Sequence, residues 1–511
     1  MVYTSKSMTK ILLPRGYRDP NVFHKKLHED TENNWNRRAK TRAVGLFHEM
    51  ADRVPAYKDY LKKHNFDPKT VKNIIDFKKI PTVDKDNYLK KYSKEQLCWD
   101  GEFANHKWTI STTSGSSGEP YYFPREKSQS WQYAVLAEQY LRNNFDIANK
   151  STLYIIAFPM GAWIGGVFTY EALEIISENS DYNLSIITAG ISKQEVINSV
   201  KQLGKSFDQI IIGSYAPFLK DILDDGLNQG INWSDYEMGF VFSAEAFNES
   251  FREYVARMVK PKDYLRFSLN HYGTVDLGTM AHETPESVLI RKLLIEHDKL
   301  DVLFPEKQRQ PTFCQYDPSL FYFEQEGENL LCSAFSGIPL TRYDLKDYGG
   351  VISRREVHQK LKKSGIDIEV ELKKHKIQDI SWNVPFLYVY ERNDFSVSYY
   401  SFLVYPDMIR RPLFSRELEK KLTGKFSMNV EYNKAGRQHF YINVEKKAGI
   451  SSNKLENEIL EILHLSLIND SSEYRETFRM IGEPAKPIIK LWEYENEKYF
   501  KSGAKQKWVI K

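Results

Sequence analysis

The sequence has little cysteine, and that shortage argues against a disulfide-stabilised protein. Only three cysteines, Cys98, Cys314 and Cys332, occur in 511 residues, and they lie far apart in the sequence. We therefore expect a reducing compartment, and specifically the cytoplasm. No C-x-x-C pair is present, so a zinc site formed by Cys314, Cys332 and a histidine such as His282 stays an alternative without motif support.

Charge of one sign and long apolar runs are also scarce. The 72 lysines and arginines nearly balance the 68 aspartates and glutamates, which leaves a net charge of +4 and argues against nucleic-acid binding. The most apolar run, residues 155–168, is well short of the roughly 20 residues that cross a bilayer, and proline and glycine interrupt it. Residues 1–19 lack the apolar core of a signal peptide. We therefore expect neither a membrane span nor secretion.

Aromatic residues, in contrast, are plentiful, with 32 tyrosines, 29 phenylalanines and 9 tryptophans to build cores and pockets. In the helical N-terminal region of residues 1–104, Pro55 is expected to divide the apolar pattern of residues 40–66 into two helices. From about residue 105, short β-rich runs alternate with helical stretches. This alternation predicts an α/β fold with sheets buried on both faces. The expected elements include strands at residues 107–112, 151–158 and 208–214 and a helix at 128–145.

A second unit is expected to begin near residue 390. Residues 351–380, which precede it, form a charged, helix-compatible segment that we interpret as a surface insertion. The second unit alternates between strand-like and helix-like segments, at residues 397–406, 406–422, 437–447, 454–467 and 487–495. The sequence therefore predicts a large domain of residues 1–390 and a compact α+β domain of residues 391–511.

A Ser/Gly-rich segment, TTSGSSGEPYYF at residues 112–123, is the sharpest local motif. Glycines accept positive φ without strain, so their backbone N–H groups can turn toward an anion, and serine hydroxyls add short donors. The segment lacks the Lys-Ser/Thr ending of the kinase-type phosphate loop. Composition alone also fits a flexible connector, so the phosphate-binding interpretation depends on the motifs that accompany it.

Residues 113–120 resemble the Ser/Thr/Gly-rich loop of the adenylate-forming superfamily, which includes acyl-CoA synthetases, peptide-synthetase adenylation domains and luciferases. The flanking chain looks like the phenylacetate–CoA ligase-like branch of that superfamily. Further similarities follow in the family's order, at residues 54–92, 160–166, 242–255, 270–278, 339–347, 391–409 and 502–510. Each motif is weak alone, and their common order is what supports the resemblance.

The resemblance implies a large N-terminal multi-sheet α/β domain and a small, mobile α+β lid domain. It also implies ATP- and Mg²⁺-dependent activation of a carboxylic acid as an acyl-AMP, followed by transfer to CoA as co-substrate. Transfer to an amine or to a carrier-protein thiol is an alternative, and a nucleotide-binding protein without turnover is another. The identity of the acid stays open, and a homodimer is expected from the branch.

By the same resemblance, the family's functional residues map onto positions of this chain. Phosphates would be bound by Thr113, Ser114, Gly115, Ser116, Ser117 and Gly118. Adenine and ribose would be bound by Ser243, Ala244, Glu245, Tyr272, Gly273, Thr274, Asp347 and Arg342, the last of these near the nucleotide or the hinge. The hinge would contain Arg392 and Asp394, and the catalytic lysine would be Lys505 or Lys507. Asp276 would bind Mg²⁺, and the acid pocket would include Trp163, Tyr215 and His271, although core packing explains Trp163 equally well.

Four positions depart from the family pattern. Glu119 replaces the usual lysine of the loop, and Val275 replaces a Ser/Thr hydroxyl that Thr274 could supply instead. Asp276 replaces a glutamate and keeps the carboxylate on a side chain one methylene shorter. Ser401 replaces a glycine near the hinge, which bears on transfer to the acceptor rather than on adenylation.

Overall fold

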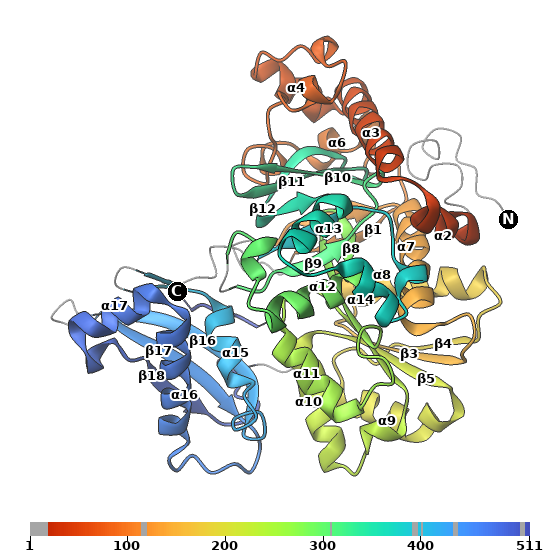
Figure 1. Cartoon of the computed structure of the whole chain (residues 1–511). Helices are drawn as coiled ribbons and strands as arrows, with labels where there is room; N and C mark the ends of the chain where they lie inside the picture. Colours follow the sequence, from red (N-terminus) through yellow and green to blue (C-terminus); the bar gives the residue numbers. More distant parts are fainter. Residues whose placement is uncertain are drawn as a thin grey trace.

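The computed structural model describes residues 19–113, 120–306, 309–390, 397–399, 402–432, 438–500 and 506–510. The chain forms a large part and a smaller C-terminal part, drawn in blue at the left of Figure 1. No helix within these ranges is long and apolar enough to cross a bilayer.

Helices form the N-terminal region, as the apolar spacing predicts. They are α2 (Pro20–Glu29), α3 (Glu32–Arg53), α4 (Pro55–Lys63), α5 (Ile74–Phe77) and α6 (Lys94–Leu97). Asp19 and Thr31 cap the first two helices by accepting hydrogen bonds from backbone N–H groups of the first turn. Pro55 occupies the first position of α4, where its missing N–H costs no helical hydrogen bond. The expected division into two helices is confirmed.

An eleven-stranded sheet lies at the centre of the large part, in the order β10-β11-β12-β13-β9-β8-β7-β6-β5-β3-β4. Its strands are β3 (Thr152–Ala157), β4 (Leu184–Ile187), β5 (Gln209–Ser214), β6 (Met238–Phe242), β7 (Ser268–Thr274), β8 (Gly278–His282), β9 (Thr312–Gln315), β10 (Phe321–Glu326), β11 (Asn329–Ala334), β12 (Leu340–Ile352) and β13 (Phe386–Val389). From β4 to β7 the neighbours are parallel, and from β7 to β10 they are antiparallel. The sheet therefore changes from parallel to antiparallel pairing at β7.

Helices cover both faces of the parallel half, which confirms the predicted α/β arrangement. Along β3, Leu153 and Ile155 pack in the core that contains residues of α9, α10 and α11, whereas Tyr154 and Ile156 pack in the core of α7 and α8. The helices of the large part are α7 (Lys127–Phe145), α8 (Ile164–Glu178), α9 (Lys193–Leu203), α10 (Ala216–Asn228), α11 (Glu249–Val259), α12 (Pro285–Glu296), α13 (Arg354–Lys363) and α14 (Ile368–Lys374). The charged segment that we interpreted as an insertion supplies the last two.

A separate two-stranded hairpin carries the Ser/Gly-rich segment. Strand β1 (Thr109–Thr112) pairs antiparallel with β2 (Tyr122–Arg125), so the segment connects two hydrogen-bonded strands. Its outermost pairs are Thr109 with Arg125 and Thr112 with Tyr122. The strand expected at residues 107–112 is confirmed.

The C-terminal part has its own three-stranded sheet and its own hydrophobic core. Its elements are β14 (Val397–Tyr399), β15 (Phe402–Val404), α15 (Pro406–Leu413), β16 (Leu422–Tyr432), β17 (Gln438–Lys446), α16 (Leu455–Asp470), α17 (Ser472–Ile481) and β18 (Ile488–Trp492). The expectation of one helix over residues 406–422 is wrong. The helix ends at Leu413, and β16 begins at Leu422.

Candidate active site

The hairpin β1–β2 holds the Ser/Gly-rich segment at both of its ends. The backbone N–H of Thr113 donates to the Tyr121 carbonyl at 3.0 Å, and the Tyr121 N–H donates to Thr113 Oγ1 at 3.0 Å. The Thr112 N–H donates to the Ala162 carbonyl at 2.9 Å, which ties the hairpin to the turn before α8. Ser114, Gly115, Ser116, Ser117, Gly118 and Glu119 lie outside the described residues. Phosphate binding by this loop stays a prediction.

The structure brings together two of the residues predicted to hold adenine and ribose. Tyr272, on β7, donates its hydroxyl hydrogen bond to Oδ2 of Asp347, on β12, at 2.7 Å. Burial, together with the Asp347 charge, raises the pKa of Tyr272 well above its ordinary value, so the hydroxyl keeps its proton. A carboxylate oriented by a tyrosine at a strand end is suited to accept further hydrogen bonds from a ribose.

Gly273 is required by the sheet itself. A Cβ at this position would lie 2.6 Å from the carbonyl oxygen of Gly278 and 3.0 Å from Cα of Thr279, both on β8. The strand pairing therefore explains the glycine without a nucleotide. Next to it, Thr274 Oγ1 accepts a hydrogen bond from the Leu277 N–H at 3.3 Å, so this hydroxyl helps to form the turn between β7 and β8.

Asp276, the predicted Mg²⁺ ligand, is buried in that turn between polar partners. Its Oδ2 accepts a hydrogen bond from the Tyr343 hydroxyl, and its Oδ1 lies 3.5 Å from Nζ of Lys85. Burial and the adjacent Asp276 charge raise the pKa of Tyr343 well above its ordinary value. Within the described ranges, no three His, Cys, Asp or Glu side chains gather as a metal site would require. The zinc alternative at Cys314, Cys332 and His282 therefore has no support, whereas Mg²⁺ takes one or two carboxylates together with substrate phosphates, which Asp276 can satisfy.

The C-terminal tail reaches the predicted nucleotide site. The backbone N–H of Gln506 donates to Oε1 of Glu245 at 2.9 Å, directly after the end of β6. Ala244 adopts a positive φ of 70°, a conformation that L-residues rarely take. Ser243 precedes it as the first residue after β6. This segment therefore combines backbone strain with a contact from the other part of the molecule.

The described end of the tail is also hydrogen-bonded to the C-terminal sheet. The Met428 N–H donates to the Trp508 carbonyl at 2.7 Å, and the Trp508 ring packs 4.8 Å from that of Phe426. Lys507 is exposed, and Lys505 lies outside the described residues, as do Arg392, Asp394 and Ser401 of the hinge region. The choice between the two lysines stays open.

Arg342 is paired with acceptors inside the protein. Its guanidinium lies 2.6 Å from Oε2 of Glu326 and 3.4 Å from Oε2 of Glu324, and it donates to the Ile80 carbonyl oxygen. The side chain is almost fully buried, and its φ of 48° bends β12 at this point. Internal acceptors occupy the guanidinium, and the location of Arg342 near the nucleotide or the hinge stays a prediction.

The three residues predicted for the acid pocket have different surroundings. Trp163 is 47% exposed at the start of α8, so the core-packing explanation is wrong. The Tyr215 ring packs 5.5 Å from that of Phe158 at the end of β5. His271 is buried on β7, with the ring centroids of Tyr140 at 4.9 Å and Tyr133 at 6.1 Å. Burial lowers the pKa of His271 well below its ordinary value, so the imidazole is neutral.

Two lysines of the N-terminal region lie beside the hairpin, and motif comparison missed both. Lys85 is the one near Asp276, and Nζ of Lys94 lies 3.1 Å from the ring centroid of Tyr121. Burial lowers the pKa of Lys94 to about 8. Because Glu119 replaces the loop's usual lysine, positive charge near this hairpin comes from another segment. The sequence contains both lysines, but only the tertiary structure shows that they lie near the hairpin.

No family model and no curated protein matches the chain in sequence. Solved structures do match over almost the full length. A 2-hydroxyisobutyryl-CoA ligase in the postadenylation state, bound to R3-HIB-AMP, has a TM-score of 0.64 at 10% identity, over 95% of this chain and 91% of that chain. AtGH3.15 acyl acid amido synthetase, bound to 2,4-DB, has a TM-score of 0.62 at 12% identity, over 98% and 95%.

The chain has the fold of the acyl-adenylate-forming enzymes. The same ligase in its thioesterification state gives a lower TM-score of 0.53, at 12% identity over 95% of this chain and 91% of that chain.

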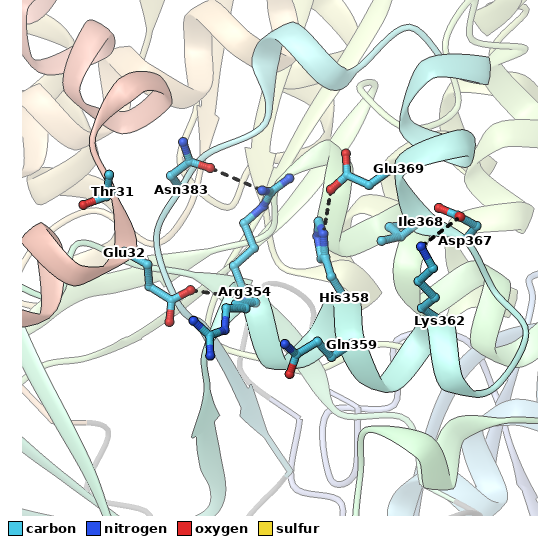
Figure 2. Close-up of a pocket in the computed structure, with 11 residues that line it drawn as sticks. Thr31, Glu32, Arg354, His358, Gln359, Lys362, Asp367, Ile368, Glu369 and Asn383 are labelled. Carbon is cyan, nitrogen blue, oxygen red and sulfur yellow. Dashed lines mark hydrogen bonds and ion pairs between the residues drawn. The ribbon is translucent and has the colours of Figure 1, made fainter.

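A surface pocket of about 450 Å³ lies elsewhere in this fold, between the start of α3 and helices α13 and α14 (Figure 2). His358 bridges the buried Glu286, at 2.7 Å, and the exposed Glu369, at 2.9 Å, while Arg354 binds Glu286 at 2.9 Å. None of the predicted site residues lines it. These ion pairs explain why the charged side chains gather at this pocket without a bound ligand.

Proposed function

We propose that the protein activates a carboxylic acid with ATP, forming an acyl-AMP and pyrophosphate, and then transfers the acyl group to an acceptor. The observation that carries the proposal is the joining of Tyr272 and Asp347 at one strand end, with the C-terminal tail anchored at Glu245. The adenylate-forming fold supports it as the framework on which such a site is built.

In the adenylation step, an oxygen of the substrate carboxylate attacks the α-phosphorus, and the bond to the pyrophosphate oxygen breaks. Both reactants are anions, so the step requires positive charge and N–H donors directed at the phosphates. Thr113 begins the loop that would supply those donors, and Lys85 adds a cation beside it. Mg²⁺ would neutralise charge on the phosphates, with Asp276 as its protein ligand.

The acceptor is proposed to be CoA. The two kinds of enzyme that match the fold differ in this step, since one is a CoA ligase and the other an acyl acid amido synthetase with a nearly equal TM-score. An amine acceptor is therefore the second candidate. We propose a cytoplasmic location as well, because the described cysteines are all free and buried, as suits a reducing compartment. A homodimer stays an expectation.

ATP–pyrophosphate exchange across a panel of carboxylic acids tests the first half-reaction. We expect label to enter ATP only when a suitable acid and Mg²⁺ are present, and the exchange to be lost in the double variant Lys505→Ala, Lys507→Ala. Lys498→Ala, which changes an exposed lysine before the tail, is the matched control. Absence of acid-dependent exchange over a broad panel would contradict the proposal. Mass spectrometry of products formed with CoA or with amines then identifies the acceptor.

A further inference from the structure

Arg125, the last residue of β2, is a buried cation with two unused donors. Its side chain is 2% exposed, and its Nη1 donates to Ser111 Oγ at 2.6 Å. Its Nε and Nη2 are buried and have no hydrogen-bond partner. Within the part of the chain that the structure describes, no carboxylate forms an ion pair with it. Such a buried guanidinium is costly, because its two unused donors lose their hydrogen bonds to water and gain none from the protein.

Glu171, whose charge acts on Arg125, is committed to other partners. Glu171, on α8, accepts a hydrogen bond from Ser130 Oγ at 2.5 Å through one oxygen and from Thr109 Oγ1 at 3.1 Å through the other. Burial lowers the pKa of Arg125 to about 10, and the more distant Glu171 charge opposes that shift only in part. The guanidinium remains charged at neutral pH and lacks a counter-ion in contact.

The position of Arg125 connects it to the candidate acid pocket. Its guanidinium carbon lies 4.8 Å from the ring centroid of Phe168, and that ring stacks on Tyr133 at 4.5 Å. Tyr133 in turn lies 6.1 Å from His271, whose Nε2 is also buried without a partner. Arg125 is therefore separated from His271, the residue beside Tyr272, by the stacked rings of Phe168 and Tyr133.

We propose that Arg125 binds a second carboxylate at the far end of the acid, so that the substrate is a dicarboxylic acid. The inference rests on the proposed function, because it concerns the acid that is activated. The two unused N–H donors, on Nε and Nη2, lie on one edge of the guanidinium and match the two oxygens of a carboxylate. The first carboxylate reacts with ATP, and the second stays ionised against Arg125.

The test compares ATP–pyrophosphate exchange for acids matched in length, such as hexanoate with adipate and 4-methylbenzoate with terephthalate. For the wild type we expect kcat/KM of the preferred diacid to exceed that of its monoacid by about 100-fold or more, as expected for a buried charge pair. In Arg125→Gln the diacid-to-monoacid ratio should fall by about 100-fold. Arg142→Gln, in the last turn of α7, removes a hydrogen bond to Asn21 and should keep the wild-type ratio.

Binding of the diacid provides a second measurement that does not depend on turnover. The diacid should raise the thermal midpoint of the wild type and of Arg142→Gln, but not that of Arg125→Gln. Circular dichroism checks that each variant is folded, and Arg125→Lys replaces the glutamine variant if that protein does not fold. Exchange with monoacids alone, or a diacid preference that survives in Arg125→Gln, would overturn the inference. If no acid supports exchange, the proposed function is overturned, and this inference with it.

Discussion

The Tyr272 hydroxyl donates a hydrogen bond to the Asp347 carboxylate at 2.7 Å, although the two residues are 75 positions apart. Three strands, β13, β9 and β8, separate β12 from β7 in the order of the main sheet, so the contact joins strands that are not direct neighbours. The contact orients a carboxylate in a partly buried site, where a hydrogen bond to a bound ligand is worth more than in water. Predictions about the site follow from this geometry.

Asp347→Ala should weaken ATP binding by about 1–3 kcal/mol, because it removes a charged hydrogen-bond acceptor. Isothermal titration calorimetry with ATP measures the change. The control is Asp344→Ala, which removes a nearby carboxylate that binds Lys346 on the same strand. Equal ATP affinity in Asp347→Ala and the wild type would contradict the ribose assignment.

Lys85→Ala should raise the KM for ATP by about 10- to 100-fold, because the lysine supplies positive charge beside Asp276 and the phosphate hairpin. Lys85→Arg should restore part of the loss. Steady-state exchange kinetics at varied ATP provide the measurement. Lys90→Ala, which breaks an exposed pair with Asp86, is the matched control. Identical ATP dependence in both alanine variants would exclude Lys85 from the site.

Lys425→Met should lower the free energy of unfolding by about 3–5 kcal/mol, because it leaves buried carboxylates without their cation. Lys425, on β16, forms a hydrogen-bonded pair with Asp221 of α10 and lies 3.3 Å from Glu445. All three side chains are almost completely buried where the C-terminal part meets the large part. Urea denaturation measures the effect.

The control for this pair is Glu493→Ala, which removes the exposed partner of Lys446 and should change stability by no more than about 0.5 kcal/mol. A similarly small effect of Lys425→Met would show that the interface does not depend on this ion pair.

Stability should fall as the pH drops below about 6.5, because buried histidines are held neutral. Burial lowers the pKa of His282 to about 3, while its ring packs against those of Tyr140, His271 and Trp382. The unfolded chain therefore binds a proton that the folded chain excludes, and each such histidine costs up to about 1.4 kcal/mol per pH unit between its two pKa values. The full stability is therefore present above the pKa that the histidine has in the unfolded chain.

Urea denaturation of the wild type and His282→Gln at pH 7, 6, 5 and 4 measures this slope. The variant should lose less stability per pH unit, by an amount that corresponds to one proton. His375→Gln, at an exposed position, should retain the wild-type slope. Parallel pH profiles for all three proteins would refute the explanation.

Local elements were predictable because their signals lie in adjacent residues. Pro55 separates α3 from α4, and the apolar runs of β3 and β5 are buried strands as expected. The helix expected over residues 406–422 is shorter than predicted, since it ends at Leu413. The order of the eleven strands could not be predicted, because pairing depends on contacts between distant segments.

The sequence by itself determined which residues compose the candidate nucleotide site, since Tyr272, Asp276 and Asp347 each belong to a short motif of the adenylate-forming type. Only the tertiary structure decided what these residues contact. It engaged Arg342 with two glutamates, explained Gly273 by the backbone of β8 and left two donors of Arg125 without partners. The physical reason is that a motif specifies residue types over a few positions, whereas charge pairing and burial depend on side chains that the fold brings in from elsewhere.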